Sequence, residues 1–190
     1  MSITINNLVK SFDDKAVLRG FSLEIRDGET VCIMGPSGCG KTTLINILLG
    51  LVCQDEGEIT GVPQKAAAVF QEPRLCEEFS LLSNVKIAAA KGTDVREIDA
   101  CLEGLGLQGL AGKKVRVLSG GQKQRAAIAR ALLSDYDLIV MDEPFKGLDE
   151  GTRETVMDFV RKSVAGKTCI IVTHERKEAE FFSERIINMV

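Results

Sequence analysis

The sequence has no tryptophan, a single histidine, and six cysteines that form no CxxC pair. The histidine does not stand at metal-ligand spacing from any cysteine, which argues against a zinc site, and the scattered cysteines argue against a disulfide framework. We therefore expect reduced thiols, most of them buried as small apolar side chains.

Long apolar runs are also missing. The longest one spans residues 44–53, is interrupted by Asn46 and Gly50, and is much shorter than the ~20 residues that cross a bilayer. The N-terminus alternates polar and apolar residues and lacks the basic start and apolar run of a secretory signal. These absences predict a chain that stays in the cytosol and does not itself span a membrane.

The charge balance argues against a nucleic-acid partner. The 24 basic and 27 acidic residues give a net charge of −3. No segment shows the clustered lysines and arginines with interleaved aromatics that a nucleic-acid face needs. We expect no nucleic acid among the partners.

Hydrophobic periodicity predicts an α/β fold. Alternating polar and apolar residues over 3–12 and 17–25 predict strands of a half-buried antiparallel subdomain at the N-terminus. Short runs that are apolar on both faces then alternate with helical patterns, as the strands of a helix-covered, mostly parallel sheet do. These runs are residues 31–34, 67–70, 138–142 and 169–173. The helical patterns cover residues 41–49, 94–105, 120–133, 150–165 and 175–182, and a last strand is expected at 185–189.

Two helical patterns between residues 80 and 112 interrupt this alternation of strand and helix. They predict a small helical subdomain inserted into the sheet core. A chain of 190 residues has the usual size of one domain. We therefore expect a single domain over 1–190, in which residues of approximately 80–134 form the inserted subdomain.

A glycine-rich stretch directly after the strand at 31–34 matches the pattern G-x-x-x-x-G-K-[ST] and directly precedes a helix. Its glycines let backbone N–H groups turn toward phosphate oxygens, Lys41 reaches the outer phosphates, and the Thr42 hydroxyl can ligate Mg²⁺. The alternative is a glycine-rich turn that binds nothing, but the flanking strand and helix favour phosphate binding. The candidate nucleotide-binding residues here are Gly35, Pro36, Ser37, Gly38, Cys39, Gly40, Lys41, Thr42 and Thr43.

Two carboxylates follow the buried run at 138–141, at the strand end where open α/β sheets place their ligands. Asp142 fits the role of holding Mg²⁺ or its waters. Glu143 points the other way and fits the role of polarising the attacking water. Taken alone, the two acids could equally begin a solvated loop, but the phosphate loop strengthens the catalytic interpretation.

The only histidine, His174, directly follows the strand at 169–173. A lone histidine is more often structural than catalytic. Here, however, three strand ends deliver a phosphate loop, two carboxylates and an imidazole to one edge of the sheet, as expected of a functional site. We predict that His174 hydrogen-bonds the terminal phosphate.

Residues 118–122 read Leu-Ser-Gly-Gly-Gln and precede a helical run. Ser119, Gly120, Gly121 and Gln122 offer a hydroxyl and exposed N–H groups at a helix N-terminus, which makes a second candidate anion site. By composition alone, Ser119 could simply cap an ordinary helix.

With this segment the chain resembles the nucleotide-binding domains of ABC ATPases, whose LSGGQ signature lies between the phosphate loop and the acidic strand, as it does here. The resemblance covers nearly the whole chain. It implies a P-loop NTPase core that binds ATP with Mg²⁺ and hydrolyses it.

The resemblance assigns further residues. Phe12 is similar to the aromatic residue that stacks on adenine, although it could be an ordinary strand residue. Gln71 is similar to the glutamine that touches Mg²⁺ and the attacking water and senses the membrane partner. Asp149 is similar to the aspartate of the loop that communicates between two subunits, although Lys146 and Gly147 replace the Ser-Ala common in the family.

In this family two domains pair head to tail, so that the phosphate loop of one and the Ser119 segment of the other clamp each ATP. The resemblance thus implies a homodimer, or a pair with a related ATPase, in the ATP-bound state. It also implies a transmembrane permease as partner, a solute-binding protein as a further one, and a peripheral place on the inner face of the cell membrane.

The predicted function is to power a transporter, and three interpretations stay open. The segment 69–74 is similar to importer subunits for nitrate, sulfonate or related small solutes. An export-type ATPase carries the same motifs. A non-transport ATPase acting on nucleic acid or ribosomes typically has coiled-coil insertions or two ATPase domains, and this chain has neither.

Overall fold

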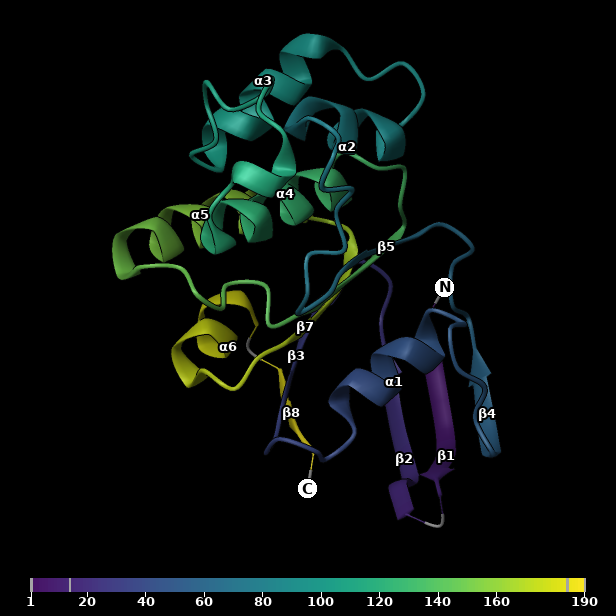
Figure 1. The fold of residues 1–190 in the computed structure, drawn as a ribbon. Coiled ribbons are helices and arrows are strands. Elements are labelled where there is room, and N and C mark those ends of the chain that lie inside the picture. The colour runs from purple at the N-terminus through teal and green to yellow at the C-terminus, as the bar shows by residue number, and fades with distance from the viewer. Residues whose placement is uncertain (1, 14, 184, 190) are drawn as a thin grey trace.

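The computed structural model describes residues 2–13, 15–183 and 185–189. Their strands form two sheets (Figure 1): a three-stranded antiparallel sheet in the order β2-β1-β4 and a five-stranded sheet in the order β5-β6-β7-β3-β8. The antiparallel sheet consists of β1 (Ile3–Phe12), β2 (Lys15–Ile25) and β4 (Glu56–Thr60). The second sheet consists of β3 (Thr30–Met34), β5 (Ala66–Val69), β6 (Leu138–Asp142), β7 (Thr168–Val172) and β8 (Ile186–Asn188).

All neighbouring strands of the second sheet run parallel. Successive side chains of a strand point to opposite faces, and here both faces are covered. In β6, for example, Leu138 and Val140 lie in a core shared with β1, β2 and the helix α1, whereas Ile139 and Met141 lie in the core on the other side. This double burial explains why these strands read as continuous apolar runs.

Helices connect the parallel strands and cover the sheet (Figure 1). Between β5 and β6 the chain forms three helices and a 3₁₀ turn, with α2 and α3 at the upper end of the view. The helices are α1 (Lys41–Leu48), α2 (Leu81–Ala88), α3 (Val95–Gly104), α4 (Gly120–Leu132), α5 (Glu150–Ser163) and α6 (Arg176–Phe182), and the 3₁₀ turn is η1 (Val115–Val117).

The predicted α/β class, with a parallel core and an antiparallel N-terminal sheet, is confirmed, and the predicted elements agree with the structure to within about two residues at their ends. Strand β4 was not predicted. The single domain over 1–190, with its insert at about 80–134, stays a prediction.

The expectation that most thiols are buried is only half right. All six cysteines are unpaired: Cys32, Cys101 and Cys169 are buried, but Cys53 and Cys76 are exposed and Cys39 is intermediate. The two exposed thiols lie in connections outside the helices and strands, where no hydrophobic pattern is required.

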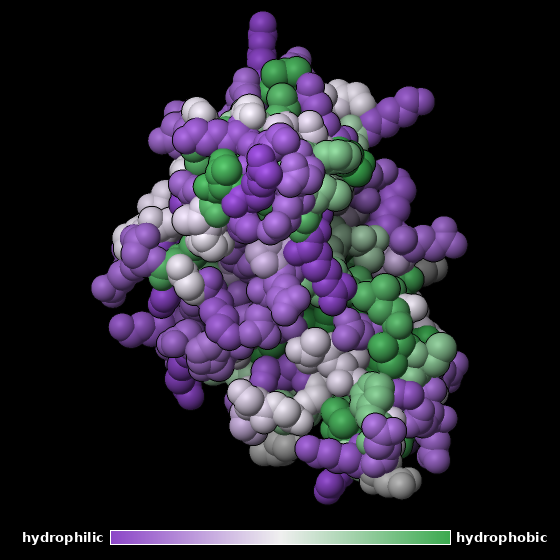
Figure 2. All heavy atoms as spheres, in the orientation of Figure 1, coloured by the Kyte–Doolittle hydropathy of each residue, from purple (hydrophilic) through white to green (hydrophobic). Residues whose placement is uncertain are grey.

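Within the described ranges, none of the helices has the length and apolar character needed to cross a membrane. The face shown in Figure 2 is largely hydrophilic, and its hydrophobic residues form separate small patches.

Candidate nucleotide-binding site

The glycine-rich loop connects β3 to α1 and lies at the lower end of Figure 1. Gly40, the N-cap of α1, adopts the left-handed conformation with φ 101°. A Cβ at this position would lie 2.8 Å from Leu18 Cδ2 and 3.1 Å from Val17 Cγ1. Glycine is therefore required both by the backbone conformation and by the close approach of β2.

The loop leaves the start of α1 open to an anion. Gly40 has no side chain with which to cap the helix, so the N–H groups of the first turn are not satisfied by a capping side chain. Lys41 Nζ donates to the carbonyl oxygens of Gly35 and Pro36, at 2.8 Å each. The loop thus holds an ammonium group beside a helix N-terminus, and both features attract phosphate.

A hollow of about 470 Å³ lies beside this loop. Its walls are formed by residues 15–21 of β2 together with Gly38, Cys39, Asn188 and Met189. Phe12 ends the neighbouring strand β1, is paired with Lys15 and is 46% exposed. An accessible ring at this edge is available for stacking on a flat base.

Thr42 and Asp142, which are 100 residues apart in the sequence, meet in the structure. The Thr42 hydroxyl donates to Asp142 Oδ2 at 2.8 Å. Burial raises the pKa of the Asp142 carboxyl, while the Thr42 hydrogen bond and the Lys41 ammonium lower it. A buried carboxylate beside a hydroxyl is a donor set that fits Mg²⁺, because this ion binds oxygen ligands and stabilises the ionised form.

No group of three or more His, Cys, Asp or Glu side chains suited to a metal occurs in the described part of the chain. Thr42 and Asp142 would therefore hold only part of the shell of a Mg²⁺ ion, and substrate phosphates and water would supply the rest, as is usual for Mg²⁺ at nucleotide sites.

Glu143 and His174 are also brought together. His174 Nδ1 lies 2.7 Å from Glu143 Oε2. An ionised carboxylate can only accept, so Nδ1 carries the hydrogen of this bond, and Nε2 lies 3.5 Å from Glu175 Oε1. The Glu143 side chain is 13% exposed and that of His174 is 55% exposed, which leaves the imidazole accessible to a ligand.

The backbone of Glu143 is left-handed, with φ 49°, an uncommon conformation for a residue other than glycine. Its N–H donates to Val172 O at 2.9 Å, which ties it to the end of β7. Conformations of this kind are found at functional sites, where the surrounding structure holds them in place.

Gln71 lies beyond β5, whose last residue Val69 pairs with Met141 of β6. The glutamine is exposed and follows a strand end next to that of Asp142. Arg130 of α4 donates to the carbonyl oxygens of Pro73 and Arg74, at 3.2 and 2.9 Å. Sequence reasoning missed Arg130, which fixes the loop after Gln71 to the helix that follows the signature segment.

Ser119 caps α4 in the ordinary structural way. Its hydroxyl accepts from Gln122 N at 3.3 Å, and Gln122 Oε1 accepts from Ser119 N at 2.9 Å, which completes a capping box. The capping interpretation is therefore correct for the isolated chain. It does not exclude a ligand at Ser119, because the residue and Gly120 are both exposed.

Asp149 caps α5. Its Oδ1 accepts from Thr152 N at 3.0 Å, and the hydrogen bonds with Thr152 lower the pKa of its carboxyl. This cap fixes the conformation of the preceding loop, where Gly147 has φ 76°. The glycine that departs from the family pattern thus occupies a position that suits glycine.

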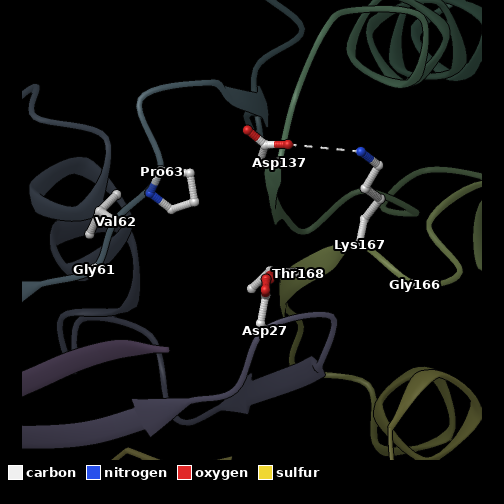
Figure 3. Close-up of a pocket in the computed structure, with 8 residues that line it drawn as sticks. All are labelled: Asp27, Gly61, Val62, Pro63, Asp137, Gly166, Lys167 and Thr168. Carbon is white, nitrogen blue, oxygen red and sulfur yellow. Dashed lines mark hydrogen bonds and ion pairs between the residues drawn. The ribbon is translucent and has the colours of Figure 1, made fainter. Parts of the chain in front are cut away.

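Another cavity, of about 420 Å³, is unrelated to these residues (Figure 3). It lies at the amino ends of β6 and β7, between Asp137 and Lys167, whose charged groups are 3.9 Å apart. The phosphate loop, Glu143 and His174 lie at the carboxyl ends of parallel strands, which is the opposite edge of the sheet.

The fold and the site together define a P-loop nucleoside triphosphatase. The sequence pattern of the ABC transporter family matches residues 18–146. The chain belongs to this family, and it is an ATP-binding subunit that hydrolyses ATP.

Two curated relatives are import ATP-binding proteins. An aliphatic sulfonates import ATP-binding protein of Nocardia farcinica is 42% identical over 190 residues, which cover 98% of this chain and 77% of the relative. A taurine import ATP-binding protein of Roseobacter denitrificans is 40% identical over 206 residues, with the same two coverages of 98% and 77%.

Solved structures show the same fold. A bacterial ABC transporter cassette solved as a dimer has a TM-score of 0.88 at 33% identity and covers 98% of this chain and 94% of its own. A dimeric post-hydrolysis state of an ATP-binding cassette with ADP and Pi has a TM-score of 0.86 at 34% identity, with coverages of 98% and 94%.

Proposed function

We propose that this chain powers the import of a small organic anion of the sulfonate class, working as one of two ATP-binding copies on the inner face of the membrane beneath a permease. The observation that carries the proposal is the similarity over 98% of the chain to import ATP-binding proteins for aliphatic sulfonates and taurine. It favours import over the export and non-transport alternatives. A separate solute-binding protein would deliver the anion to the permease.

The geometry supports the following roles in ATP hydrolysis. The backbone N–H groups that the loop at residues 35–43 offers, all except that of Pro36, which has none, bind the phosphates together with Lys41, and Phe12 stacks on the base. Thr42 and Asp142 would hold Mg²⁺, with Gln71 as a further oxygen ligand in place of one water, and the ion would neutralise phosphate charge. Glu143 orients and polarises the attacking water.

His174 is assigned a role at the terminal phosphate of ATP. Because Nδ1 donates to Glu143, Nε2 is the nitrogen that would contact the terminal phosphate, and it donates to a phosphate oxygen when the ring carries a hydrogen on both nitrogens. The contact between the two residues keeps the carboxylate and the imidazole in fixed positions relative to each other. A fixed polar environment needs little rearrangement when charge develops in the transition state.

We infer that each site needs a second copy. The helix α4, which begins at the exposed Ser119, lies far above the phosphate loop in Figure 1, so the two anion sites of one chain are widely separated. Ser119, Gly120, Gly121 and Gln122 of one copy would face the γ-phosphate held by the other, with Asp149 at the contact between copies. Residues of approximately 80–134 would form the inserted subdomain.

Substitutions of Ser119 separate its capping role from this second role. Asn and Asp cap helices about as well as Ser, so both variants should keep the melting temperature of the parent. Ser119→Asp places a negative charge beside the partner's γ-phosphate and is expected to lower ATPase activity about 10²-fold. The neutral, equally sized Ser119→Asn is the matched control and should lose at least tenfold less. Equal activities of the two variants would contradict a shared site.

The permease is expected to dock on α2 and the loop before it. Phe79 is 49% exposed and Ile87 is 66% exposed, and together with Ser83 and Lys86 they line a shallow hollow of about 400 Å³. Exposed apolar groups of this size around a hollow are typical of a protein contact.

Purification of the tagged chain with its membrane partner provides the complex for two tests, and the first concerns the transported anion. Taurine or a short alkanesulfonate, added with the solute-binding protein, should stimulate the ATPase of the reconstituted complex, and sulfate should not.

The second test concerns the docking surface. Ile87→Glu should lose copurification and stimulation but keep the basal ATPase rate, because a charge is costly in an apolar contact. Leu51→Glu is the control for adding a charge at an exposed apolar residue, because Leu51 is 56% exposed and lies just after α1, outside the proposed docking surface. Stimulation that survives in Ile87→Glu would refute the docking surface.

A further inference from the structure

One buried carboxylate is not used by the proposed mechanism. Glu178, on α6, is only 5% exposed. Its Oε2 accepts a hydrogen bond of 2.6 Å from the hydroxyl of Thr173, which is itself fully buried. Burial raises the pKa of the Glu178 carboxyl, although the Thr173 hydrogen bond and the charge of Arg153 lower it. A buried carboxylate destabilises a fold unless its partners compensate, so its contacts are informative.

The first contact leads to the histidine. Besides donating to Glu178, Thr173 Oγ1 accepts from Glu175 N at 3.1 Å, and Thr173 N donates to Ile33 O at 3.2 Å. Thr173 and Glu175, the residues on both sides of His174, are therefore held by hydrogen bonds that share the Thr173 hydroxyl. Because Glu178 sets the direction in which that hydroxyl donates, it also sets the backbone from which His174 reaches Glu143.

The second contact leads to the loop that follows Glu143. Arg153 Nε lies 3.9 Å from Glu178 Oε1, and Arg153 Nη2 donates to Leu148 O at 3.1 Å. The helix α6 also contacts this loop through Phe182, whose ring stacks on that of Phe145 with 5.3 Å between the ring centroids. The helix α6 thus contacts this loop directly at Phe145, and it reaches Leu148 indirectly through Arg153 of α5.

We propose that Glu178 is a positioning residue for ATP hydrolysis, which holds the His174 loop and the 145–149 loop in one fixed arrangement around Glu143. The inference rests on the catalytic roles proposed above for Glu143 and His174. A well-packed apolar side chain would often be as stable in such a place as a buried ion pair. The contacts of the Glu178 carboxylate explain why a charged group is kept here. Thr173 belongs to the loop that carries His174, and Arg153 is bonded to the loop at 145–149, so both contacts connect Glu178 to loops at the site.

Two substitutions of Glu178 test the proposal. Glu178→Ala removes the acceptor and is expected to lower kcat about tenfold, because small displacements of catalytic groups have large effects on rate. KM for ATP should change less than about twofold, since the phosphate loop is untouched. Glu178→Gln keeps an oxygen that can accept from Thr173 and should recover kcat to within about threefold of the parent. A Gln variant as slow as the Ala variant would overturn the proposal.

A destabilised core variant shows whether the loss is merely structural. Val160, on α5, is fully buried and apolar, and Val160→Ala is expected to lower the melting temperature by creating a cavity. The ATPase of both variants is compared at temperatures equally far below their own melting temperatures. If Val160→Ala then loses as much kcat as Glu178→Ala, the proposal fails.

A double-mutant cycle with His174→Ala identifies the route of the effect. If Glu178 acts through the histidine loop, Glu178→Ala should lower kcat by less than about twofold in the His174→Ala background. A further tenfold loss there would overturn the route through the His174 loop, because only the route through Arg153 and residues 145–149 could produce it. A normal kcat in His174→Ala alone would instead refute the proposed site and with it this inference, whereas a slow His174→Ala beside a normal Glu178→Ala would refute only the inference.

Discussion

Replacing Glu143 with glutamine is expected to lower kcat for ATP hydrolysis about 10³-fold while ATP still binds, which is the range of loss for a general base. Glutamine has the size of glutamate but cannot take a proton from water. The nucleotide contacts of the phosphate loop are unaffected, so ATP should accumulate on the protein, and the two-copy assembly should persist because its γ-phosphate is not removed.

The local structure should survive this substitution. The amide oxygen of a glutamine can still accept from His174 Nδ1, and the N–H that donates to Val172 O belongs to the backbone. Single-turnover hydrolysis and size-exclusion chromatography with ATP measure the two effects. Glu180→Gln is the matched control, since Glu180 pairs with Arg176 on the surface of α6, where an ion pair contributes little. Turnover within tenfold of the parent, or an ATP-independent monomer, would disprove the role of Glu143.

The parallel core could be predicted from the sequence because its strands are buried on both faces. The run at 138–142 was predicted with the bounds that β6 has, since no polar residue interrupts its apolar residues before Asp142. The helix starts at residues 120 and 150 were predicted equally well, and in the structure Ser119 and Asp149 are the N-caps whose side chains bond the first turn.

Strand β4 could not be predicted in this way. Its sequence, Glu56–Thr60, contains Gly57 and a single large apolar residue, Ile59, so it carries no alternating pattern. The strand exists because β1 offers a free edge, against which Gly57 packs so closely that a Cβ would lie 2.5 Å from Asn7 O. This is a tertiary effect on a segment with little strand propensity of its own.

The site was predictable in its location but not in its bonds. The rule that parallel strands end at one edge brings Lys41, Asp142 and His174 together. The pairing of Thr42 with Asp142 and of His174 with Glu143 depends on side-chain directions that no pattern specifies. Glu178 was missed because it lies in a strongly polar run, residues 175–180, whose composition is typical of an exposed helix face.

Replacing Lys41 with alanine is expected to weaken ATP binding about 10²-fold or more. Hydrogen bonds of an ammonium to phosphate are about twice as strong as neutral ones, and in the proposed site Lys41 makes them to the outer phosphates. The change also removes the donor of the bonds to Gly35 O and Pro36 O. Two carbonyl oxygens of the loop would then point toward the phosphates without a cation between them, and their partial negative charge adds to the loss.

Titration with a fluorescent ATP analogue measures the nucleotide affinity. Thermal unfolding without nucleotide shows whether the substitution also changes the stability of the fold. Lys162→Met, at an exposed position of α5, is the control for loss of a positive charge and should bind normally. Lys41→Arg should recover only part of the affinity, because the longer, planar guanidinium cannot occupy the place where one Nζ meets two carbonyl oxygens. If Lys41→Ala binds like the parent, the loop between β3 and α1 is not the phosphate site, and the roles assigned to Thr42 and Asp142 fail with it.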